Sequence, residues 1–137
     1  MRVQEIMTRR IATVHQDDRL EFVRDIFIQS AFRHLLVLDS QEQLCGIISH
    51  ADMSRALSPY LGTDAEVERD RDTLQRRVHQ VMSRNMVTIT GAATLQSAAR
   101  IMLEHNIGCL PVMDNGKLLG LVSWKDLLRQ VIKLNEG

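Results

Sequence analysis

The sequence predicts a mixed α/β fold of the α+β kind, in which two copies of one β-α-β-β-α unit stand in tandem. Two observations predict it. The chain matches itself at an offset of 75 residues, which becomes 74 after one loop, and each copy repeats the same order of apolar periods. An internal repeat sets the architecture before any single element does. Because there are only two copies, we expect a closed pair rather than an open solenoid.

The match runs along both copies. The stretch GIISHAD at residues 46–52 returns at residues 120–126 as GLVSWKD. We therefore divide the chain into repeat one at residues 1–57, a connector at residues 58–77 and repeat two at residues 78–137. The identical pairs include Val3/Val78, Met7/Met82, Thr13/Thr88, Leu20/Leu95, Val37/Val112, Gly46/Gly120, Ser49/Ser123, Asp52/Asp126 and Arg55/Arg129.

Each copy contains three predicted strands. β-Branched residues at 11–14 and 86–89 favour a short first strand. The apolar segments 34–49 and 109–123 are each interrupted by a turn, which predicts a pair of strands in each copy. In the second copy the turn reads DNGK, and Asn-Gly tolerates the positive φ angles of a type I′ hairpin.

Each copy also contains two predicted helices. The first helix shows apolar residues on one face, with Asp17 or Asp18 as its N-cap in copy one and Thr94 in copy two. Asn106 is a candidate for the left-handed residue that ends the helix of copy two. The second helix of each copy begins directly after a serine. The four predicted helical segments are residues 17–30, 50–57, 94–106 and 124–134.

The connector at residues 58–77 is dense in alternating charge and contains a proline and a glycine. These features favour a solvated link. Its later half, residues 64–77, has the i,i+4 charge pairs of an exposed helix. Its length is unusual for a bare loop, so we expect it to pack on the body of the protein or on a partner chain.

Composition excludes several classes of function. The chain has 137 residues, about one domain, with 17 basic and 17 acidic residues and only 4% aromatic residues. Balanced charge and few aromatic residues make nucleic-acid binding an unfavoured prediction. No apolar run is long enough for a signal peptide or a membrane span. Together with the two cysteines, which are too few for a disulfide framework, these features predict a cytoplasmic protein without a membrane partner.

No motif of a known catalytic or metal site occurs in the sequence. The five histidines lack metal-ligand spacing, and nucleotide-binding loops and nucleophile signatures are absent. Cys45 and Cys109 lie in or beside apolar runs, which favours buried thiols. We therefore predict no catalytic residue, no metal and no required cofactor.

The duplicated motifs resemble a CBS-domain pair (a Bateman module), of the type that stands alone in bacteria. Each copy has Met followed by Thr or Ser before the first strand, a β-strand ending in Asp, and Gly, two aliphatic residues and Ser-x-x-Asp at the start of the last helix. The resemblance covers residues 3–57 and 78–133. It implies two repeats packed about a pseudo-twofold axis, two clefts for adenosine-containing ligands, and a disc-like homodimer.

The resemblance assigns Asp52 and Asp126 to the ribose of such a ligand, since a carboxylate accepts hydrogen bonds from vicinal hydroxyls. Ser49 and Ser123 lie three residues earlier and belong to the same predicted sites. A structural alternative stays open, because Ser-x-x-Asp is also a good helix N-cap.

The resemblance also places Thr13 and Thr88 on the adenine and ribose side of the clefts, whereas ordinary strand propensity explains them equally well. Gly46 and Gly120 lie inside predicted strands, which indicates a bulge or the close approach of a ligand or of other backbone. Packing between the repeats explains these glycines as well as ligand access does.

The phosphate end of a nucleotide requires positive charge, and here the copies differ. Repeat one has Arg33 and His34 before its second strand, where repeat two has Gly108 and Cys109. The resemblance predicts that Arg33 and His34 face Ser123 and Asp126 in one cleft, with Lys125 adding charge. It leaves His50 with Ser49 and Asp52 in a cleft poorer in charge.

These features together predict a regulatory module that is not an enzyme. Its ligand would be AMP, ADP or ATP, or alternatively S-adenosylmethionine or NAD, and it would modulate a target protein that the sequence does not identify. Two alternatives stay open. One is a homodimeric interaction module that needs no ligand, and the other is a redox regulator that uses Cys45 or Cys109.

Overall fold

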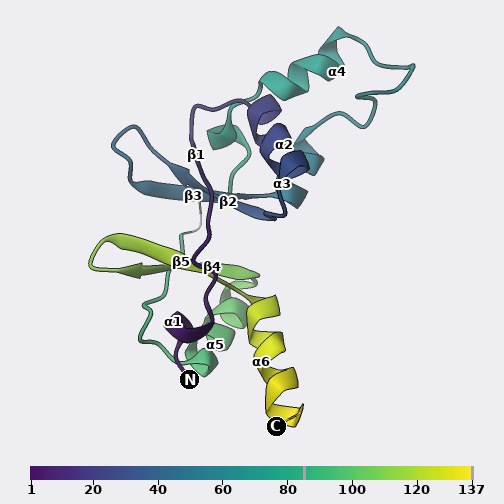
Figure 1. Ribbon diagram of the computed structural model, residues 1–137. Helices are drawn as coiled ribbons and strands as arrows, with labels where there is room; N and C mark the ends of the chain where they lie inside the picture. Colours follow the sequence, from purple (N-terminus) through teal and green to yellow (C-terminus); the bar gives the residue numbers. More distant parts are fainter. Residues whose placement is uncertain (85, 137) are drawn as a thin grey trace. The chain divides into compact units, whose positions relative to one another are not determined.

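A computed structural model of the protein describes residues 1–84 and 86–136, which form two compact units (Figure 1). Unit 1 contains Met1–Ile11 and Val87–Gly137, and unit 2 contains Ala12–Met86. The units do not coincide with the two sequence repeats. The first segment of each repeat instead lies in the unit that holds the rest of the other repeat.

Unit 2 is built on a three-stranded sheet in the order β1-β2-β3. Residues of the two outer strands alternate between buried and less buried positions, as strands with one covered face require, whereas the three middle residues of the central strand are all buried. Strand β1 runs parallel to β2, and β2 and β3 form an antiparallel hairpin. The elements of this part are β1 (Thr13–His15), α2 (Leu20–Gln29), β2 (His34–Leu38), β3 (Leu44–Ser49) and α3 (His50–Ala56).

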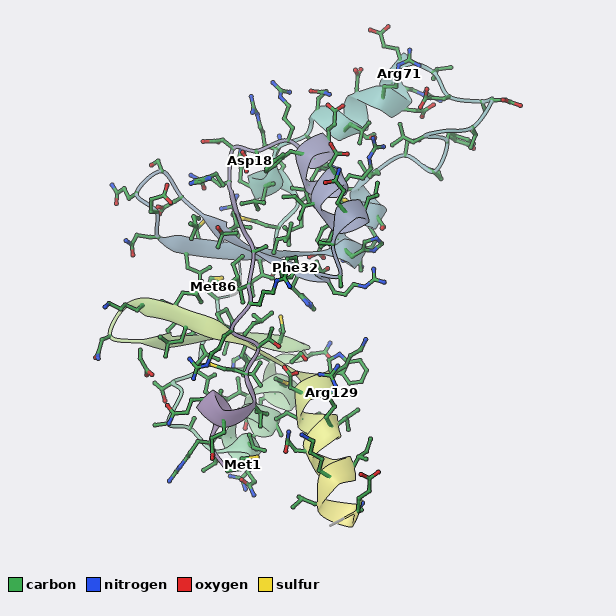
Figure 2. The ribbon with its side chains drawn as sticks, viewed as in Figure 1. Met1, Asp18, Phe32, Arg71, Met86 and Arg129 are labelled. Atoms are coloured by element: carbon green, nitrogen blue, oxygen red, sulfur yellow. The ribbon has the colours of Figure 1, made fainter. Side chains whose placement is uncertain are left out.

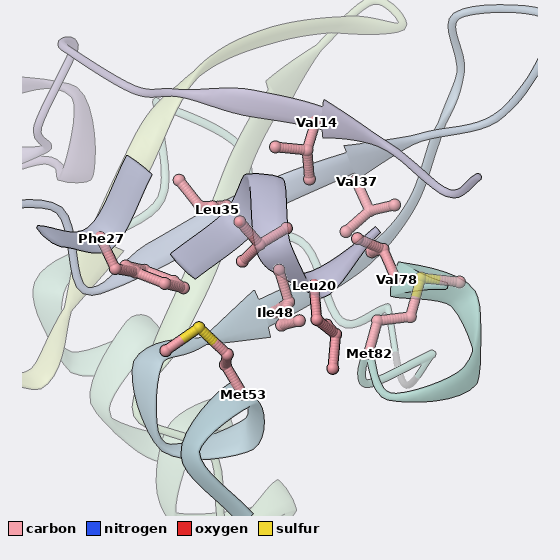
Figure 3. Close-up of a cluster of buried hydrophobic side chains, with 10 residues drawn as sticks. Val14, Leu20, Phe27, Leu35, Val37, Ile48, Met53, Val78 and Met82 are labelled. Carbon is pink, nitrogen blue, oxygen red and sulfur yellow. The ribbon is translucent and has the colours of Figure 1, made fainter. Parts of the chain in front are cut away.

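The core of unit 2 lies between the sheet and α2 (Figure 3). Leu20, Leu35 and Ile48 are fully buried there. Val78 and Met82, from the first segment of repeat two, complete the same core. Repeat one alone therefore lacks part of its own hydrophobic core.

The connector is folded, as its charge pattern predicts in part. It contains α4 (Glu68–Asp72) and the 3₁₀ turn η1 (Thr73–Gln75), and the 3₁₀ turn η2 (Val78–Gln80) follows at the start of repeat two. Asp70 is only 6% exposed. Its carboxylate accepts hydrogen bonds from the Ser58 hydroxyl at 2.8 Å and the Val67 N–H at 2.9 Å. These bonds join Ser58, the first residue of the connector, to the start of α4.

Unit 1 repeats this plan with a shorter sheet. Strands β4 (Cys109–Asp114) and β5 (Lys117–Ser123) form the hairpin, and its turn has positive φ at Asn115 and Gly116, as predicted. The helices are α1 (Val3–Ile6), α5 (Leu95–His105) and α6 (Trp124–Glu136).

The predicted first strand of copy two is reduced to one parallel bridge, between Ile89 and Val112. After this bridge the chain bonds to α1. The N–H groups of Gln4 and Val3 donate to the carbonyls of Gly91 and Ala93, each at 2.9 Å. The prediction of a full strand at residues 86–89 is therefore wrong.

Both predicted caps of α5 are confirmed. Thr94 accepts a hydrogen bond from the Ser97 N–H at 3.1 Å, and Asn106 is left-handed with φ 52° and ψ 49°. The expected cap of α2 by Asp17 or Asp18 is wrong. Its N-cap is Arg19, and the Leu20 N–H donates to the Arg76 carbonyl, 2.9 Å away. The side chain of Asp18 instead accepts from the His15 N–H at 2.8 Å.

The first segment of each repeat pairs with the second strand of the hairpin in the unit where it lies. In unit 1, Thr8 and Leu121 exchange two backbone hydrogen bonds of 2.8 and 2.9 Å. In unit 2, Ser83 and Ile47 do the same, at 2.8 and 3.0 Å. The two pairs occupy equivalent positions of the repeats, so both units use the same exchange.

The crossing segments explain the two strand glycines. A Cβ atom on Gly46 would lie 2.5 Å from the Met82 sulfur and 2.9 Å from the Ser83 carbonyl oxygen. A Cβ on Gly120 would lie 2.6 Å from the Thr8 carbonyl oxygen. Each glycine thus admits the close approach of backbone from the other repeat. Of the two explanations, packing between the repeats and ligand access, the structure favours packing.

Candidate functional site

Both Ser-x-x-Asp motifs form reciprocal caps at the start of the last helix of their repeat. Ser49 accepts from the Asp52 N–H at 3.0 Å, and the Ser49 N–H donates to Asp52 Oδ2 at 2.9 Å. Ser123 and Asp126 make the same two bonds, at 3.3 and 2.8 Å. The structural role of these residues as helix caps is therefore confirmed.

An arginine three residues after each aspartate completes the motif. Arg55 donates to Asp52 Oδ1 at 2.6 Å, and Arg129, labelled in Figure 2, donates to Asp126 Oδ1 at 2.9 Å. We did not predict these partners from the sequence. The signal was available, because Arg55 and Arg129 are identical between the copies and lie on the same helix face as the aspartates.

The two carboxylates differ in how many further hydrogen bonds they can accept. An ionised carboxylate accepts about four hydrogen bonds. Asp126 accepts a third bond, from the Ser123 hydroxyl at 3.1 Å, and its side chain is 8% exposed. Asp52 accepts two bonds, and its side chain is 21% exposed. A ligand hydroxyl therefore has easier access to Asp52.

In unit 2 the predicted cationic residues lie at the same end of the hairpin as Ser49. His34 is directly opposite Ser49 in the β2–β3 ladder. The His50 N–H donates to the Arg33 carbonyl at 3.0 Å, and the His50 ring packs edge-on against Phe27 with centroids 5.4 Å apart. The structure thus brings together the following predicted residues: Arg33, His34, Ser49, His50 and Asp52.

In unit 1 the equivalent hairpin end has different chemistry. The Trp124 N–H donates to the Gly108 carbonyl at 3.0 Å. The Lys125 ammonium lies 5.6 Å from the centroid of the Trp124 ring. Ser123, Lys125 and Asp126 are therefore neighbours, without an arginine or histidine at the position of Arg33 and His34. That Arg33 and His34 face Ser123 and Asp126 stays a prediction.

The two predicted threonines lie on the first extended piece of each repeat. Thr13 is exposed and begins β1, where it pairs with Leu36. Thr88 is also exposed, but it precedes the single bridge at Ile89 and lies outside any strand. Their role toward a ligand stays a prediction.

Both cysteines are thiols that are at least partly buried. Burial raises the pKa of the Cys45 thiol above its ordinary value, and the carboxylate of Asp39 adds to this effect. Cys109 is buried at 7% exposure. A raised pKa lowers the thiolate fraction, and the thiolate is the reactive form. These environments do not favour the redox alternative.

Two further properties follow from the described residues. Across residues 1–84 and 86–136, no three His, Cys, Asp or Glu side chains are arranged to hold a metal ion. Over the same part of the chain, every helix is too short or too polar to cross a bilayer.

The family model of the CBS domain matches residues 3–59 and again residues 78–133. The chain belongs to the CBS-domain family. A CBS domain-containing protein of Dictyostelium discoideum is 32% identical over 98% of this chain and 93% of its own length. Both matched segments carry the Ser-x-x-Asp cap described above.

Solved CBS structures have the same fold. The CBS domain of a CBS domain-containing membrane protein from Sphaerobacter thermophilus has a TM-score of 0.81 and 28% identity, over 94% of this chain and 86% of that chain. The CBS domain pair of protein MJ0100 has a TM-score of 0.78 and 22% identity, over 98% of both chains. The α+β tandem-repeat fold predicted from the sequence is thereby confirmed.

Other relatives are longer chains, of which this chain matches only a part. The homoserine O-acetyltransferase of Methanococcus vannielii is 24% identical over 94% of this chain, which spans only 24% of that enzyme. The matched part of such an enzyme is thus a minor share of its length.

Proposed function

We propose that this CBS pair is a regulatory module that binds an adenosine-containing ligand and is not itself an enzyme. AMP, ADP and ATP are the first candidates, and S-adenosylmethionine and NAD are the alternatives. The ligand would shift the population of two arrangements of the module and thereby its affinity for a target protein.

The observation that carries this proposal is the duplicated carboxylate at the start of α3 and α6. Asp52 and Asp126 are held by a serine N–H on one oxygen and an arginine on the other. A fixed carboxylate with remaining acceptor capacity suits the vicinal hydroxyls of a ribose. The solved pair of MJ0100, which has the same fold, was crystallised with 5-methylthioadenosine and S-adenosyl-L-methionine.

We propose that Arg33 and His34 bind the phosphate groups of a nucleotide. Arg33 is exposed and its guanidinium suits phosphate oxygens. The family resemblance places this pair with the ligand of Ser123 and Asp126, whereas in the strand ladder His34 is the neighbour of Ser49. Thr13 and Thr88 would contact the adenosine part, while His50 and Lys125 would each add charge to one site.

The test is a calorimetric and thermal-shift panel with AMP, ADP, ATP, S-adenosylmethionine and NADH. A ligand that binds only the folded state should stabilise it by about 2.7 kcal/mol at a hundredfold excess over its Kd. Asp52→Asn and Asp126→Asn keep a hydrogen-bond acceptor for the serine N–H but remove the charge. The variant that abolishes binding identifies which carboxylate holds the ribose.

Thr94→Ala is the matched control for Asp126→Asn, because it removes an N-cap from the same unit without touching a candidate binding residue. It should lower the melting temperature and leave the ligand response intact. If no ligand changes the melting curve of the wild type, the Ser-x-x-Asp motifs are helix caps only. The ligand-independent interaction module then replaces the sensor.

We also propose that the module is a homodimer. Large apolar side chains of α6 are at least half exposed, including Trp124, Leu128 and Ile132. Contiguous exposed apolar residues mark protein interaction surfaces. Sedimentation velocity over a range of concentrations tests this, and a monomer at every concentration would contradict it.

A further inference from the structure

The last helix of each repeat starts on the same backbone frame. In unit 2 the His50 N–H donates to the Arg33 carbonyl, and in unit 1 the Trp124 N–H donates to the Gly108 carbonyl, both at 3.0 Å. In both ladders the capping serine lies opposite the first residue of the preceding hairpin strand. Arg33 is therefore equivalent to Gly108, and His50 to Trp124. The two sites differ at these positions in their side chains and not in their backbone.

The hairpin end of unit 2 carries cationic side chains. Arg33 is exposed, and His34 and His50 are half-buried beside the cap of Asp52. The ring of His50 packs edge-on against Phe27, with centroids 5.4 Å apart. A guanidinium and two imidazoles at one carboxylate site suit a ligand that also has phosphate groups.

The hairpin end of unit 1 carries an aromatic ring at the equivalent place. A Cβ atom on Gly108 would lie 3.1 Å from Cδ1 and 3.5 Å from Nε1 of Trp124. The indole therefore occupies the space into which a side chain at residue 108 would extend. Half of Trp124 is nevertheless exposed. The Lys125 ammonium, 5.6 Å from the ring centroid, is the cation nearest to this ring among the described contacts.

The two carboxylates also differ in how they can hold a ribose. Each oxygen of a carboxylate accepts about two hydrogen bonds. Each oxygen of Asp52 already accepts one, so both oxygens can take a further ligand hydroxyl. In Asp126, Oδ2 accepts both the N–H and the hydroxyl of Ser123, which leaves one position on Oδ1. A ligand of the unit 1 site therefore depends more on contacts of its base, for which an exposed indole is suited.

We propose that the two Ser-x-x-Asp sites take different classes of adenosine ligand. The site of Asp52 in unit 2 binds a nucleotide, whose phosphate groups contact Arg33. The site of Asp126 in unit 1 binds an adenosine ligand without phosphate groups, with its base against the exposed part of Trp124. Gly108 and Trp124 together set this selectivity. The inference rests on the adenosine-binding function proposed above and adds the ligand class that each site selects.

Single-site variants allow the two sites to be measured separately by calorimetry, with adenosine, AMP, ADP and S-adenosylmethionine. In the Asp126→Asn chain, which keeps the unit 2 site, AMP should bind about tenfold or more tightly than adenosine, because its phosphate gains Arg33. This gain should shrink at high salt. In the Asp52→Asn chain, which keeps the unit 1 site, adenosine should bind at least as tightly as AMP. The S-adenosylmethionine arm shows whether that ligand is neutral or carries a sulfonium.

An exchange of the equivalent pair should transfer the preference. In the Asp52→Asn chain, Gly108→Arg with Trp124→His gives unit 1 the side chains of unit 2, and AMP should then bind about tenfold more tightly than adenosine. Both substitutions are needed, because a side chain at residue 108 would meet the indole. Leu128→Ala is the control, since Leu128 is equally exposed on α6, one turn further along, and should leave the preference unchanged. Circular dichroism and sedimentation check that fold and oligomeric state are kept.

The emission of Trp124 tests the unit 1 site without any substitution there, because Trp124 is the only tryptophan of the chain. Adenosine should change this emission in the wild type and in the Asp52→Asn chain, with the affinity that calorimetry gives. AMP at concentrations that fill only the unit 2 site should leave the emission unchanged. An emission that does not respond to bound adenosine would overturn the inference, even if the exchanged chain did not fold.

The remaining outcomes separate this inference from the function on which it rests. An equal preference for AMP in both single-site variants would overturn the selectivity and keep the adenosine-binding function. The same holds if Arg33→Ala removes an AMP preference from the chain that keeps Asp126, because Arg33 would then serve the other site. If the wild type gives neither heat nor a change in emission with any of these ligands, the proposed function fails together with the inference.

Discussion

At the scale of single residues, the aspartates of the two Ser-x-x-Asp motifs serve the fold whether or not they serve a ligand. Each carboxylate closes a helix start and receives an arginine. The sequence predicts the serine–aspartate pair, because the spacing alone brings Ser and Asp together. It does not predict which carboxylate is more accessible, because the third bond to Asp126 depends on the orientation of the Ser123 hydroxyl.

Gly46 and Gly120 should be among the least replaceable residues of the chain. We expect Gly46→Ala to destabilise the protein by about 1–3 kcal/mol, because its Cβ would meet Met82 and the Ser83 carbonyl oxygen. Gly108→Ala is the control, since its Cβ would meet only the movable side chain of Trp124, at 3.1 Å. Urea unfolding measures both, and equal losses would contradict the packing argument.

The pKa of His15 should depend on its contact with Glu42. Their side chains are 2.7 Å apart, and this hydrogen bond, followed by the charge of Glu42, raises the pKa of His15 above its ordinary value. The contact therefore stabilises the folded state fully below the ordinary pKa of histidine. This stabilisation is lost as the pH rises through the raised pKa. In an NMR titration, Glu42→Gln should lower the pKa of His15. An unchanged value would show that the contact does not persist in solution.

At the scale of elements, local patterns predicted structure wherever local contacts decide it. The Asn-Gly turn and the left-handed Asn106 are such cases, because their backbone conformations depend on the residues themselves. The cap of α2 was mispredicted because its first N–H is satisfied by Arg76, far along the chain. The first strand of repeat two was overpredicted, because strand propensity does not show that Ile89 alone forms a bridge, to Val112 of β4.

The connector should depend on Asp70 for its order. We expect Asp70→Ala to expose the connector to proteolysis, because Ser58 and Val67 would lose their shared acceptor. The variant Asp72→Ala is a nearby control on an exposed residue. Limited digestion followed by mass spectrometry locates the cleavage, and equal rates for the two variants would contradict this role.

The same residue predicts how the connector responds to acid. The Val67 N–H and then the Ser58 hydroxyl hold the pKa of Asp70 below its ordinary value. The contribution of Asp70 is therefore complete above the ordinary pKa of an aspartate and is lost as the pH falls through the lowered one. Protection of the Val67 amide from hydrogen exchange should fall over that acidic range, and unchanged protection would contradict the assignment.

At the scale of the whole molecule, the sequence repeat and the folded unit are different objects. The repeat pattern shows which residues are equivalent, but it does not show which copy pairs with which. Val78 and Met82 complete the core of unit 2 although they belong to repeat two. In the sequence, the signal for this exchange was the pair Gly46 and Gly120, since a glycine inside a strand indicates that backbone from elsewhere in the chain comes close.

This exchange predicts which fragments fold. Unit 2 is one continuous segment, Ala12–Met86, so we expect the fragment 12–86 to unfold cooperatively. The fragment 1–57, which is the whole of repeat one, should not, because it lacks Leu74, Val78 and Met82. Circular dichroism and calorimetry compare the two fragments. Cooperative unfolding of fragment 1–57 would show that the exchanged segment is dispensable.

The exchange also bears on how such a chain can arise. A lone β-α-β-β-α repeat has no second copy to fill the space over its strand glycine or to complete its core. Two separate single-repeat chains would have to trade their leading segments before either could fold, as in domain swapping. Gene fusion then makes the trade intramolecular and independent of concentration. On this view the tandem pair preserves a swapped dimer of an ancestral half-length protein within a single polypeptide.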